Sequence, residues 1–382
     1  MSTPLEVSRL AFGKQWSKRQ RRLRFTVNLK RGNSDKLLTG SIATKKQKHI
    51  VVIGGGAGTS VILEGLKKYP LRLSAIVNTF DNGGSSGWLR KQLGVLPPGD
   101  LRQCLRALSN SKIWRELLEY RFKKGLLKGQ NLGNFLISAA EDLDYSSPSD
   151  FKNKVLPNLL SVKGEVAPVS LENSHLHALL KNGKVLKRED KITASKIISE
   201  IGVARLYLKP EVQANPKALR AINQAGIIVI AAGNLYSSVL PNFLVERIKE
   251  TIRESRAKKI YVCNLTAFRG HTDNWFVEDY FKEIENYLGK GIIETVIYNN
   301  QKPAQEIVEL CGKKHIQFVM RMPAGKIKES QINKIKFYGY PLISNTIYKP
   351  KKEDKIKRSI FRHDPEKLAK AILEVSNLSF NL

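Results

Sequence analysis

The sequence has few cysteines, few acidic residues and no long apolar run. Its 382 residues include three cysteines, Cys104, Cys263 and Cys311, and their wide spacing matches neither a disulfide framework nor a zinc motif. This usage is typical of a reducing compartment, and we expect a cytoplasmic location. No apolar run is long enough to span a bilayer or to form the core of a secretory signal, so we expect neither a membrane span nor export.

Acidic residues are scarce relative to basic ones. The chain has 65 lysines and arginines against 34 aspartates and glutamates, a net charge of +31. Residues 1–48 contain 13 basic and two acidic residues, so the larger part of the excess lies beyond them. A surface with this charge attracts polyanions whatever its fold. We expect residues 1–48 to form a basic, flexible N-terminal extension, with a nucleic-acid contact and an organellar transit peptide as the alternatives.

What the chain does contain is a set of apolar, β-branched runs, each followed by small polar residues. The first run ends at Ile53 and is followed by the glycine-rich segment 54–58, after which a helical pattern begins near Thr59. Glycines at the entrance of a helix let backbone N–H groups approach a phosphate. The segment lacks both the spaced glycines of a dinucleotide site and the Gly-Lys-Ser/Thr sequence of a P-loop. A phosphate-binding turn and a purely structural turn therefore both fit.

Similar polar segments follow three further predicted strands, which end near Asn78, Ala231 and Asn264. Strands that alternate with helices form right-handed parallel crossovers, and the carboxyl ends of such strands meet at one edge of the sheet. The sequence therefore predicts an α/β fold, a Rossmann-like three-layer sandwich with a mostly parallel sheet, and a ligand crevice at that edge. Beyond the first strand, the pattern predicts strands over 72–78, 226–231, 259–264, 292–298 and 316–320, and helices over 59–68, 101–108, 113–122, 132–143, 150–160, 216–224, 243–254, 277–287, 304–310 and 365–375.

The middle of the chain has short alternating runs instead. Asn182 and Gly183 separate two such runs, and this pair is a strong signal for a β-hairpin. We therefore predict a small β-rich insertion over 165–208, inside a domain that spans 49–376 and is followed by a tail of residues 377–382. His175 and His177 lie on one face of a predicted strand, with no further ligand at metal-binding spacing, so we expect an exposed pair.

Segment 81–90 is the most specific motif in the chain. It combines a carboxylate, glycine backbone donors, two serine hydroxyls and a guanidinium within ten residues. Asp81 is suited to a divalent cation such as Mg²⁺ or to a ligand hydroxyl. The hydroxyls of Ser85 and Ser86 are suited to a phosphate, and Arg90 to its charge. A structural turn would need neither Arg90 nor both serines. We therefore predict that this segment is a glycine-rich loop that binds a ligand.

The sequence does not assemble a nucleophile set of the Ser-His-Asp or Cys-His type, and Asp81 is its candidate for a catalytic residue and for a metal ligand. We expect a nucleotide-type ligand to contact the glycine turn, the Asp81 segment and the polar segments that follow the other strands. The predicted ligand-binding residues are Gly54, Gly55, Gly56, Gly58, Thr59, Asn78, Asp81, Asn82, Gly83, Gly84, Ser85, Ser86, Arg90, Asp100, Arg102, Asn131, Asn134, Gly233, Asn234, Tyr236, Ser237, Asn264, Thr266 and Arg269.

Taken together and in this order, the motifs resemble the CofD-like family, which includes 2-phospho-L-lactate transferase and the bacterial gluconeogenesis-factor (YvcK-type) proteins. The gluconeogenesis-factor branch is the more similar of the two. The segments that carry the resemblance lie at 52–58, 81–90, 93–102, 131–134, 235–242, 261–264 and 363–369.

The resemblance implies a Rossmann-like domain that binds a nucleotide-type ligand at the strand ends, a cytoplasmic location, and a role in carbon metabolism and in cell-shape or envelope homeostasis. For the gluconeogenesis-factor branch it implies a UDP-sugar as the ligand. The transferase branch moves a phospholactyl group onto a deazaflavin with a divalent metal. That branch has two adjacent aspartates where this chain has Asp81 and Asn82, which weakens the case for metal-assisted transfer.

We therefore expect a UDP-sugar-binding regulatory protein without an established turnover, in the form of a monomer or a homo-oligomer. A Mg²⁺-dependent transferase of a phosphoester group is the first alternative. A basic protein that contacts nucleic acid through residues 1–48 is the second.

Overall fold

Seven parallel strands form the central sheet of this computed structural model, which describes residues 47–143, 160–303, 305–323, 335–346, 348 and 359–380. Every pair of neighbouring strands in the sheet is parallel. In spatial order the strands are β10 (Lys336–Tyr340), β9 (Thr295–Asn299), β8 (Lys258–Val262), β7 (Ile227–Ile230), β1 (His49–Gly54), β2 (Arg72–Val77) and β3 (Glu165–Pro168). The expected α/β fold with a mostly parallel sheet is confirmed.

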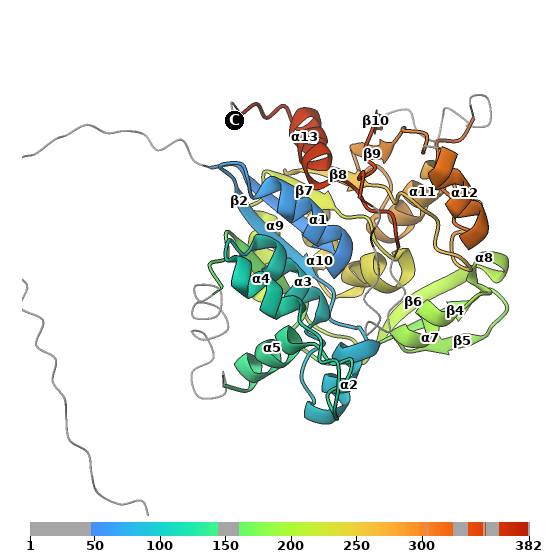
Figure 1. Cartoon of the computed structure of the whole chain (residues 1–382). Helices are drawn as coiled ribbons and strands as arrows, with labels where there is room; N and C mark the ends of the chain where they lie inside the picture. Colours follow the sequence, from blue (N-terminus) through green and yellow to red (C-terminus); the bar gives the residue numbers. More distant parts are fainter. Residues whose placement is uncertain are drawn as a thin grey trace, which may run out of the picture. The chain divides into compact units, whose positions relative to one another are not determined.

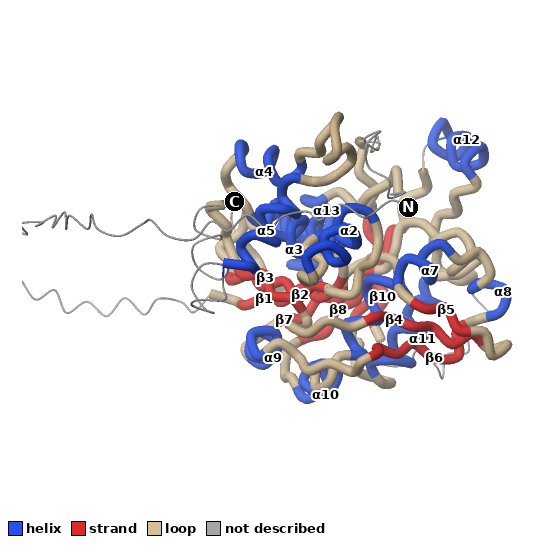
Figure 2. The backbone as a smooth tube through the Cα atoms, turned by 90° about the horizontal axis from the view of Figure 1, so that it is seen from below, coloured by secondary structure: helices blue, strands red, loops and turns tan. Residues whose placement is uncertain are grey.

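The sheet is covered on both faces, which is why its central strands are nearly pure hydrocarbon. Alternate residues of β1 enter two different cores: Val51 and Ile53 belong to one, and Ile50 and Val52 to the other. Figure 2 shows helices on both sides of the strands. One face carries α1 (Gly56–Leu66), α3 (Gly99–Leu108) and α13 (Pro365–Val375), and the other carries α9 (Pro216–Asn223), α10 (Ile248–Glu254) and α11 (Val277–Leu288). This is the three-layer arrangement that the sequence predicts.

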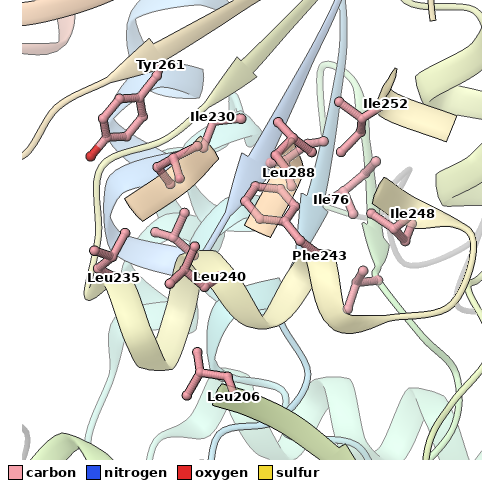
Figure 3. Packing of buried hydrophobic residues seen from close by; sticks show 14 of the residues in the cluster. Ile76, Leu206, Ile230, Leu235, Leu240, Phe243, Ile248, Ile252, Tyr261 and Leu288 are labelled. Atoms are coloured by element: carbon pink, nitrogen blue, oxygen red, sulfur yellow. The ribbon is translucent and has the colours of Figure 1, made fainter. Parts of the chain in front are cut away.

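The remaining elements lie in the segments that connect the strands. Residues 235–244 form a π-helical turn, η3 (Leu235–Val239), followed by a 3₁₀ turn, η4 (Leu240–Leu244). Figure 3 shows Leu235, Leu240 and Phe243 of these turns among the buried residues of one core. The other helices are α2 (Gly84–Leu93), α4 (Lys112–Glu119), α5 (Leu132–Leu143) and α12 (Gln305–Lys314).

A three-stranded antiparallel sheet forms the insertion, with the order β5 (Val185–Lys187), β4 (His175–Leu180) and β6 (Val203–Lys209). Its hairpin turns at Gly183, whose φ of +84° lies in the left-handed region that glycine adopts at little cost. Two short helices, α7 (Glu189–Ala194) and α8 (Ile198–Ile201), complete the insertion (Figure 1). Leu206 of β6 joins the same core as Leu240, so the insertion packs on the main sheet through η4.

The structure corrects four sequence predictions. The insertion does not begin at residue 165, because β3 pairs in parallel with β2 and belongs to the main sheet. The predicted strand at 316–320 is wrong: Phe318 makes only an isolated bridge to Thr266, and the edge strand is β10. The predicted helix at 243–254 is interrupted before α10, where Arg247 has a φ of +72°. Segment 81–90, predicted as a glycine-rich loop, enters helix α2 at Gly84.

Other boundaries differ by a few residues. Helix α1 begins at Gly56, three residues earlier than predicted. The sequence pattern did not indicate this first turn because its glycines have low helix propensity. Helix α4 ends at Glu119 instead of 122. The predicted helix at 150–160 and the extension at 1–48 lie almost wholly outside the described residues. Residues 46–382 form one compact unit, and among their described helices none is long and apolar enough to cross a membrane.

Candidate functional site

Strands β8, β7, β1 and β2 are neighbours in the sheet and run in the same direction. The four polar segments that follow them therefore start from one edge. In open parallel sheets this edge is where ligands bind.

The glycine turn after β1 is packed tightly by the protein itself. A Cβ atom at Gly58 would lie 1.7 Å from the carbonyl oxygen of Ala232, and one at Gly56 would lie 2.6 Å from Oδ1 of Asp100. The carboxylate of Asp100 thus lies beside the N-terminus of α1, where its negative charge would repel a bound phosphate. These contacts favour the structural interpretation of the turn over a phosphate cradle.

Two polar side chains near this turn have buried atoms without a hydrogen-bond partner among the described residues. They are Thr59, through its hydroxyl, and Asn234, through both its amide atoms. A buried polar atom without a partner is costly, so these groups are free to bind a ligand or a water molecule. The two side chains come from the first turn of α1 and from the segment after β7.

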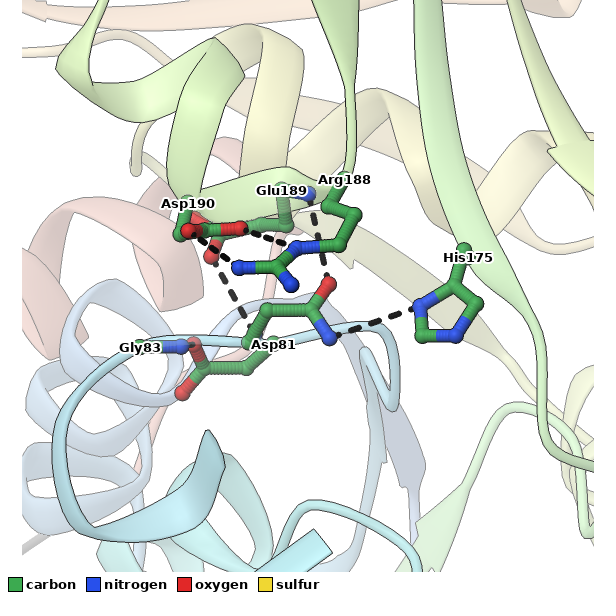
Figure 4. A network of polar contacts seen from close by, with 7 residues as sticks. Asp81, Gly83, His175, Arg188, Glu189 and Asp190 are labelled. Atoms are coloured by element: carbon green, nitrogen blue, oxygen red, sulfur yellow. Dashed lines mark hydrogen bonds and ion pairs between the residues drawn. The ribbon is translucent and has the colours of Figure 1, made fainter. Parts of the chain in front are cut away.

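The Asp81 segment turns tightly before α2 begins. Oδ1 of Asp81 accepts a hydrogen bond from the backbone N–H of Gly83 (2.7 Å), which fixes the turn. The backbone N–H of Asn82 donates to Oε2 of Glu189 (3.3 Å), and Glu189 lies in the first turn of α7. The insertion therefore closes over this segment, as Figure 4 shows.

The Asn82 amide can adopt two orientations. In one, its oxygen accepts from the backbone N–H of Glu189 (3.3 Å) and its nitrogen lies 3.4 Å from Nδ1 of His175. In the other, its nitrogen donates to the carbonyl oxygen of Phe80 (3.2 Å) and its oxygen accepts from Nη1 of Arg90 (3.1 Å). The side chain links the Asp81 segment to the insertion in the first case and to α2 in the second.

Glu189 is a buried carboxylic acid beside another one. Burial, followed by the negative charge of Asp81, raises the pKa of Glu189 to about 8, although the hydroxyl of Thr193 donates a hydrogen bond to Oε1 (2.5 Å). Like charges in a desolvated site cannot both ionise easily, so the pair retains a proton at neutral pH.

A pocket of about 510 Å³ opens beside this network, between α2 and the insertion. Its polar lining is mainly basic, because Arg90 and Lys91 come from α2 and Arg188 directly precedes α7. The pocket is lined by Asn82, Gly87, Trp88, Arg90, Lys91, His175 and Arg188.

The charged groups of the pocket are held in place by the protein. Nη2 of Arg90 donates to the carbonyl oxygen of Ser174, and burial lowers the pKa of its guanidinium. Arg188 binds Asp190 through two hydrogen bonds of 2.9 and 2.7 Å, which Figure 4 shows. Burial, with the charges of Arg90 and Arg188, lowers the pKa of His175, so its neutral form is favoured.

The other predicted ligand residues make contacts inside the protein. Buried Arg102 donates through Nε to Oδ1 of Asn134 and through Nη1 to the carbonyl oxygen of Leu118, both at 2.8 Å. The backbone N–H of Asn131 donates to the hydroxyl of Ser85 (3.1 Å). These bonds join α2, α3 and the start of α5, which gives the four residues a structural role.

At the ends of β2 and β8, two amides tie neighbouring segments together. Nδ2 of Asn78 donates to the carbonyl oxygen of Ser237 (3.3 Å). Asn264 donates through Nδ2 to the carbonyl oxygen of Gly233 (2.7 Å) and accepts through Oδ1 from its N–H (3.2 Å). Of the remaining predicted residues, Ser86 and Tyr236 are buried, Thr266 lies 3.4 Å from the hydroxyl of Ser359, and Arg269 is exposed.

Sequence reasoning missed the half of the pocket that the insertion supplies. His175, expected in an exposed pair, lines the pocket, whereas the ring of His177 lies 5.1 Å from that of Tyr207. Arg188 and Glu189 were not predicted at all. The available signal was the charged run of residues 188–190 directly after the hairpin. Among the described residues, no group of three or more histidines, cysteines or acidic residues is arranged to hold a metal ion.

Comparison with known proteins places the chain in a family. The family model described as 2-phospho-L-lactate transferase CofD matches residues 50–337. The chain belongs to the CofD family. This CofD-family chain is 35% identical over 335 residues to the gluconeogenesis factor of Halalkalibacterium halodurans, covering 86% of the chain and 97% of that relative. It is 33% identical over 333 residues to the gluconeogenesis factor of Bacillus subtilis, covering 85% and 97%.

A solved structure supports the same conclusion for the fold. A member of the UPF0052 family from Bacillus halodurans superimposes with a TM-score of 0.74 at 31% sequence identity, over 86% of this chain and 99% of that one. The resemblance to the CofD family, and to its gluconeogenesis-factor branch, is confirmed.

Proposed function

We propose that this CofD-family protein binds a nucleotide sugar of the UDP-sugar type and acts as a regulatory protein of the gluconeogenesis-factor kind, linked to carbon metabolism and to cell-shape or envelope homeostasis. The observation that carries the proposal is the basic pocket beside the Asp81 segment. Arg90, Lys91 and Arg188 line it together with the indole ring of Trp88.

The chemistry of the pocket matches the parts of such a ligand. A diphosphate carries negative charge that guanidinium groups recognise through paired hydrogen bonds, and Arg90 and Arg188 approach from two different elements. Trp88 is 39% exposed, which leaves its ring available to stack on a uracil or a sugar. The volume of about 510 Å³ lies within the range of small-molecule sites, which is roughly 300–1,000 Å³.

A Mg²⁺-dependent transfer of a phosphoester group is the second candidate, and the paired carboxylates of Asp81 and Glu189 favour it. Divalent cations bind carboxylate oxygens, and a cation would displace the proton that this pair retains. The amide of Asn82 replaces the second aspartate of the transferase branch, so the site offers one negative charge fewer for Mg²⁺. For this reason we propose binding without turnover.

Thermal unfolding of the full chain against a nucleotide panel tests the proposal. The panel contains UDP-N-acetylglucosamine, UDP-glucose, GDP and NAD, each with and without Mg²⁺. At about 100 times the dissociation constant a ligand adds about 2.7 kcal/mol to the free energy of unfolding, so a UDP-sugar should raise the melting temperature by several degrees.

Arg188→Ala should abolish most of this shift, because it removes a guanidinium from the pocket. The matched control is Lys187→Ala, since Lys187 is the exposed neighbour of Arg188 and does not line the pocket. No shift with any UDP-sugar, GDP or dinucleotide at millimolar concentration contradicts the proposal. A shift that requires Mg²⁺ and is followed by consumption of the ligand favours the transferase instead.

A further inference from the structure

The loop that joins α4 to α5 is a closed structure with a stalk and a tip. At its base, the backbone N–H of Leu132 donates to the carbonyl oxygen of Tyr120 (3.0 Å). Higher up, the N–H of Phe122 donates to the carbonyl oxygen of Gln130 (3.0 Å), and that of Gly129 to the carbonyl oxygen of Phe122 (2.8 Å). The loop is therefore fixed by its own hydrogen bonds and carries residues 123–128 as an exposed tip.

Two leucines lie at this tip. The side chain of Leu126 is fully exposed, at 104% of its reference area, and Leu127 is 36% exposed. They sit in a turn that begins at Gly125, with a φ of +69°, and that closes with a hydrogen bond from the N–H of Lys128 to the carbonyl oxygen of Gly125 (3.0 Å). Single exposed leucines are common on protein surfaces. Here, however, two adjacent leucines occupy a turn, where polar residues normally occur.

All charged residues of the loop that carries the leucines are basic. Arg121, Lys123, Lys124 and Lys128 lie in the loop, and no aspartate or glutamate occurs between Glu119 and Glu141. Apolar side chains beside a cluster of lysines and arginines are the combination that binds the surface of an anionic bilayer. The apolar groups enter the boundary between headgroups and acyl chains, and the cations remain at the lipid phosphates.

We propose that the loop of residues 120–131 docks onto an anionic lipid surface, with Leu126 and Leu127 inserted below the headgroups. Charge complementarity selects this occupant, since every charged group of the loop is positive. A nucleic acid would use the lysines but would leave both leucines in water, so it does not account for the tip.

The docked loop would bring the basic pocket close to the lipid surface. Phe122 of the loop contacts Phe135 of α5 with ring centroids 6.3 Å apart, and Phe135 contacts Trp88 of α2 at 6.0 Å. Trp88 also lines the pocket. The inference itself rests on the loop and is independent of the ligand proposed for the pocket.

Co-sedimentation of the full chain with vesicles tests the proposal. We expect binding to vesicles of phosphatidylcholine with phosphatidylglycerol, and little binding to phosphatidylcholine alone. Replacing both leucines, Leu126→Asp with Leu127→Asp, should weaken binding about tenfold or more, because burial of one leucine side chain corresponds to a tenfold to hundredfold gain. Lys123→Gln should weaken it about fivefold.

The matched control is Leu171→Asp, since Leu171 is 56% exposed and lies outside the loop. It should bind vesicles as the wild-type chain does. All variants should keep the wild-type melting temperature, as their positions are exposed. Equal binding by the double-leucine variant would overturn the proposal, because the basic residues 1–48 or general charge would then account for the interaction.

A local probe provides a second, independent measurement. The three native cysteines are buried, so Leu126→Cys offers one accessible thiol for an environment-sensitive dye. Its fluorescence should rise on anionic vesicles, whereas a dye at Leu171→Cys should not respond. An unchanged signal at position 126, or an equal response to double-stranded RNA, would overturn the proposal.

Discussion

Glu189 shows how a single side chain connects two parts of the fold. Its residue lies in the insertion, yet its carboxylate is buried against the Asp81 segment of the main domain and accepts a hydrogen bond from the backbone of Asn82. A protonated carboxyl satisfies this position better than an ionised one, because Asp81 already supplies a negative charge.

The stability of the protein should therefore depend on pH through Glu189. The unfolded carboxyl ionises near its ordinary pKa of 4.5 and the folded one near about 8, so the folded protein binds one more proton between these values. The free energy of unfolding then falls as the pH rises from about 4.5 to about 8. Glu189→Gln removes this loss. In urea unfolding the variant should be more stable than the wild type near pH 9 and equal to it near pH 4.5.

Glu254→Gln is the control for this comparison, since Glu254 is exposed, and its stability should follow the wild-type pH dependence. If Glu189→Gln were less stable than the wild type across the whole range, the folded carboxyl would have to be ionised. The pair of Asp81 and Glu189 would then not share a proton.

At the residue scale, the sequence could predict those site residues that lie close together in the chain. Asp81, Asn82 and Arg90 lie within one short segment, and the structure places all three at the pocket or beside it. His175 and Arg188 reach the same place from far along the chain, through tertiary contacts that no local pattern encodes. Asn82, which contacts His175 and the backbone N–H of Glu189, is about a hundred residues away from both in the sequence.

Among the elements, the junction of β1 and α1 is the most sensitive to a change of side chain. Gly58→Ala places a methyl group 1.7 Å from the backbone oxygen of Ala232, so the segment after β7 must move. We expect a loss of about 3 kcal/mol in the free energy of unfolding, measured by urea denaturation. The size of this loss reports how closely α1 must approach the end of the neighbouring strand.

Gly94→Ala is the matched substitution at a helix end. Gly94 follows α2 with a φ of +71°, and no atom lies within 4 Å of the added Cβ. It should cost only about 1 kcal/mol, the penalty for a left-handed alanine. Equal losses in the two variants would show that close packing against Ala232 is not what requires Gly58.

Elements with a strong apolar pattern were predictable from the sequence. Elements whose conformation depends on pairing or packing with another element were not. Strand β1 is buried along its whole length and could be predicted from composition alone. Strand β10 was missed because it lies at the edge of the sheet, pairs only with β9 and contains a glycine, Gly339. Helix α2 was taken for a loop because Gly84-Ser85-Ser86-Gly87 has low helix propensity, which its packing against α5 overrides.

For the whole molecule, the net charge of +31 is the property most open to measurement. Repulsion among like charges destabilises a compact chain, and salt screens it over about 8–10 Å at physiological ionic strength. The melting temperature of the full chain should therefore rise as NaCl is added from low to physiological concentration. A gain of 1 kcal/mol corresponds to about 2–4 °C in domains somewhat smaller than this one. A constant or falling melting temperature would mean that favourable ion pairs balance the repulsion.

The antiparallel insertion enters the chain after β3 and leaves it before α9, so it is a continuous segment that interrupts the parallel fold at one place. It supplies Arg188 and His175 to the pocket, while Arg90 and Lys91 come from the main domain. Ligand preference can therefore change through substitutions in one short unit, without disturbing the strands that stabilise the sheet. The insertion is the part of the chain to exchange between relatives when their specificities are to be compared or redesigned.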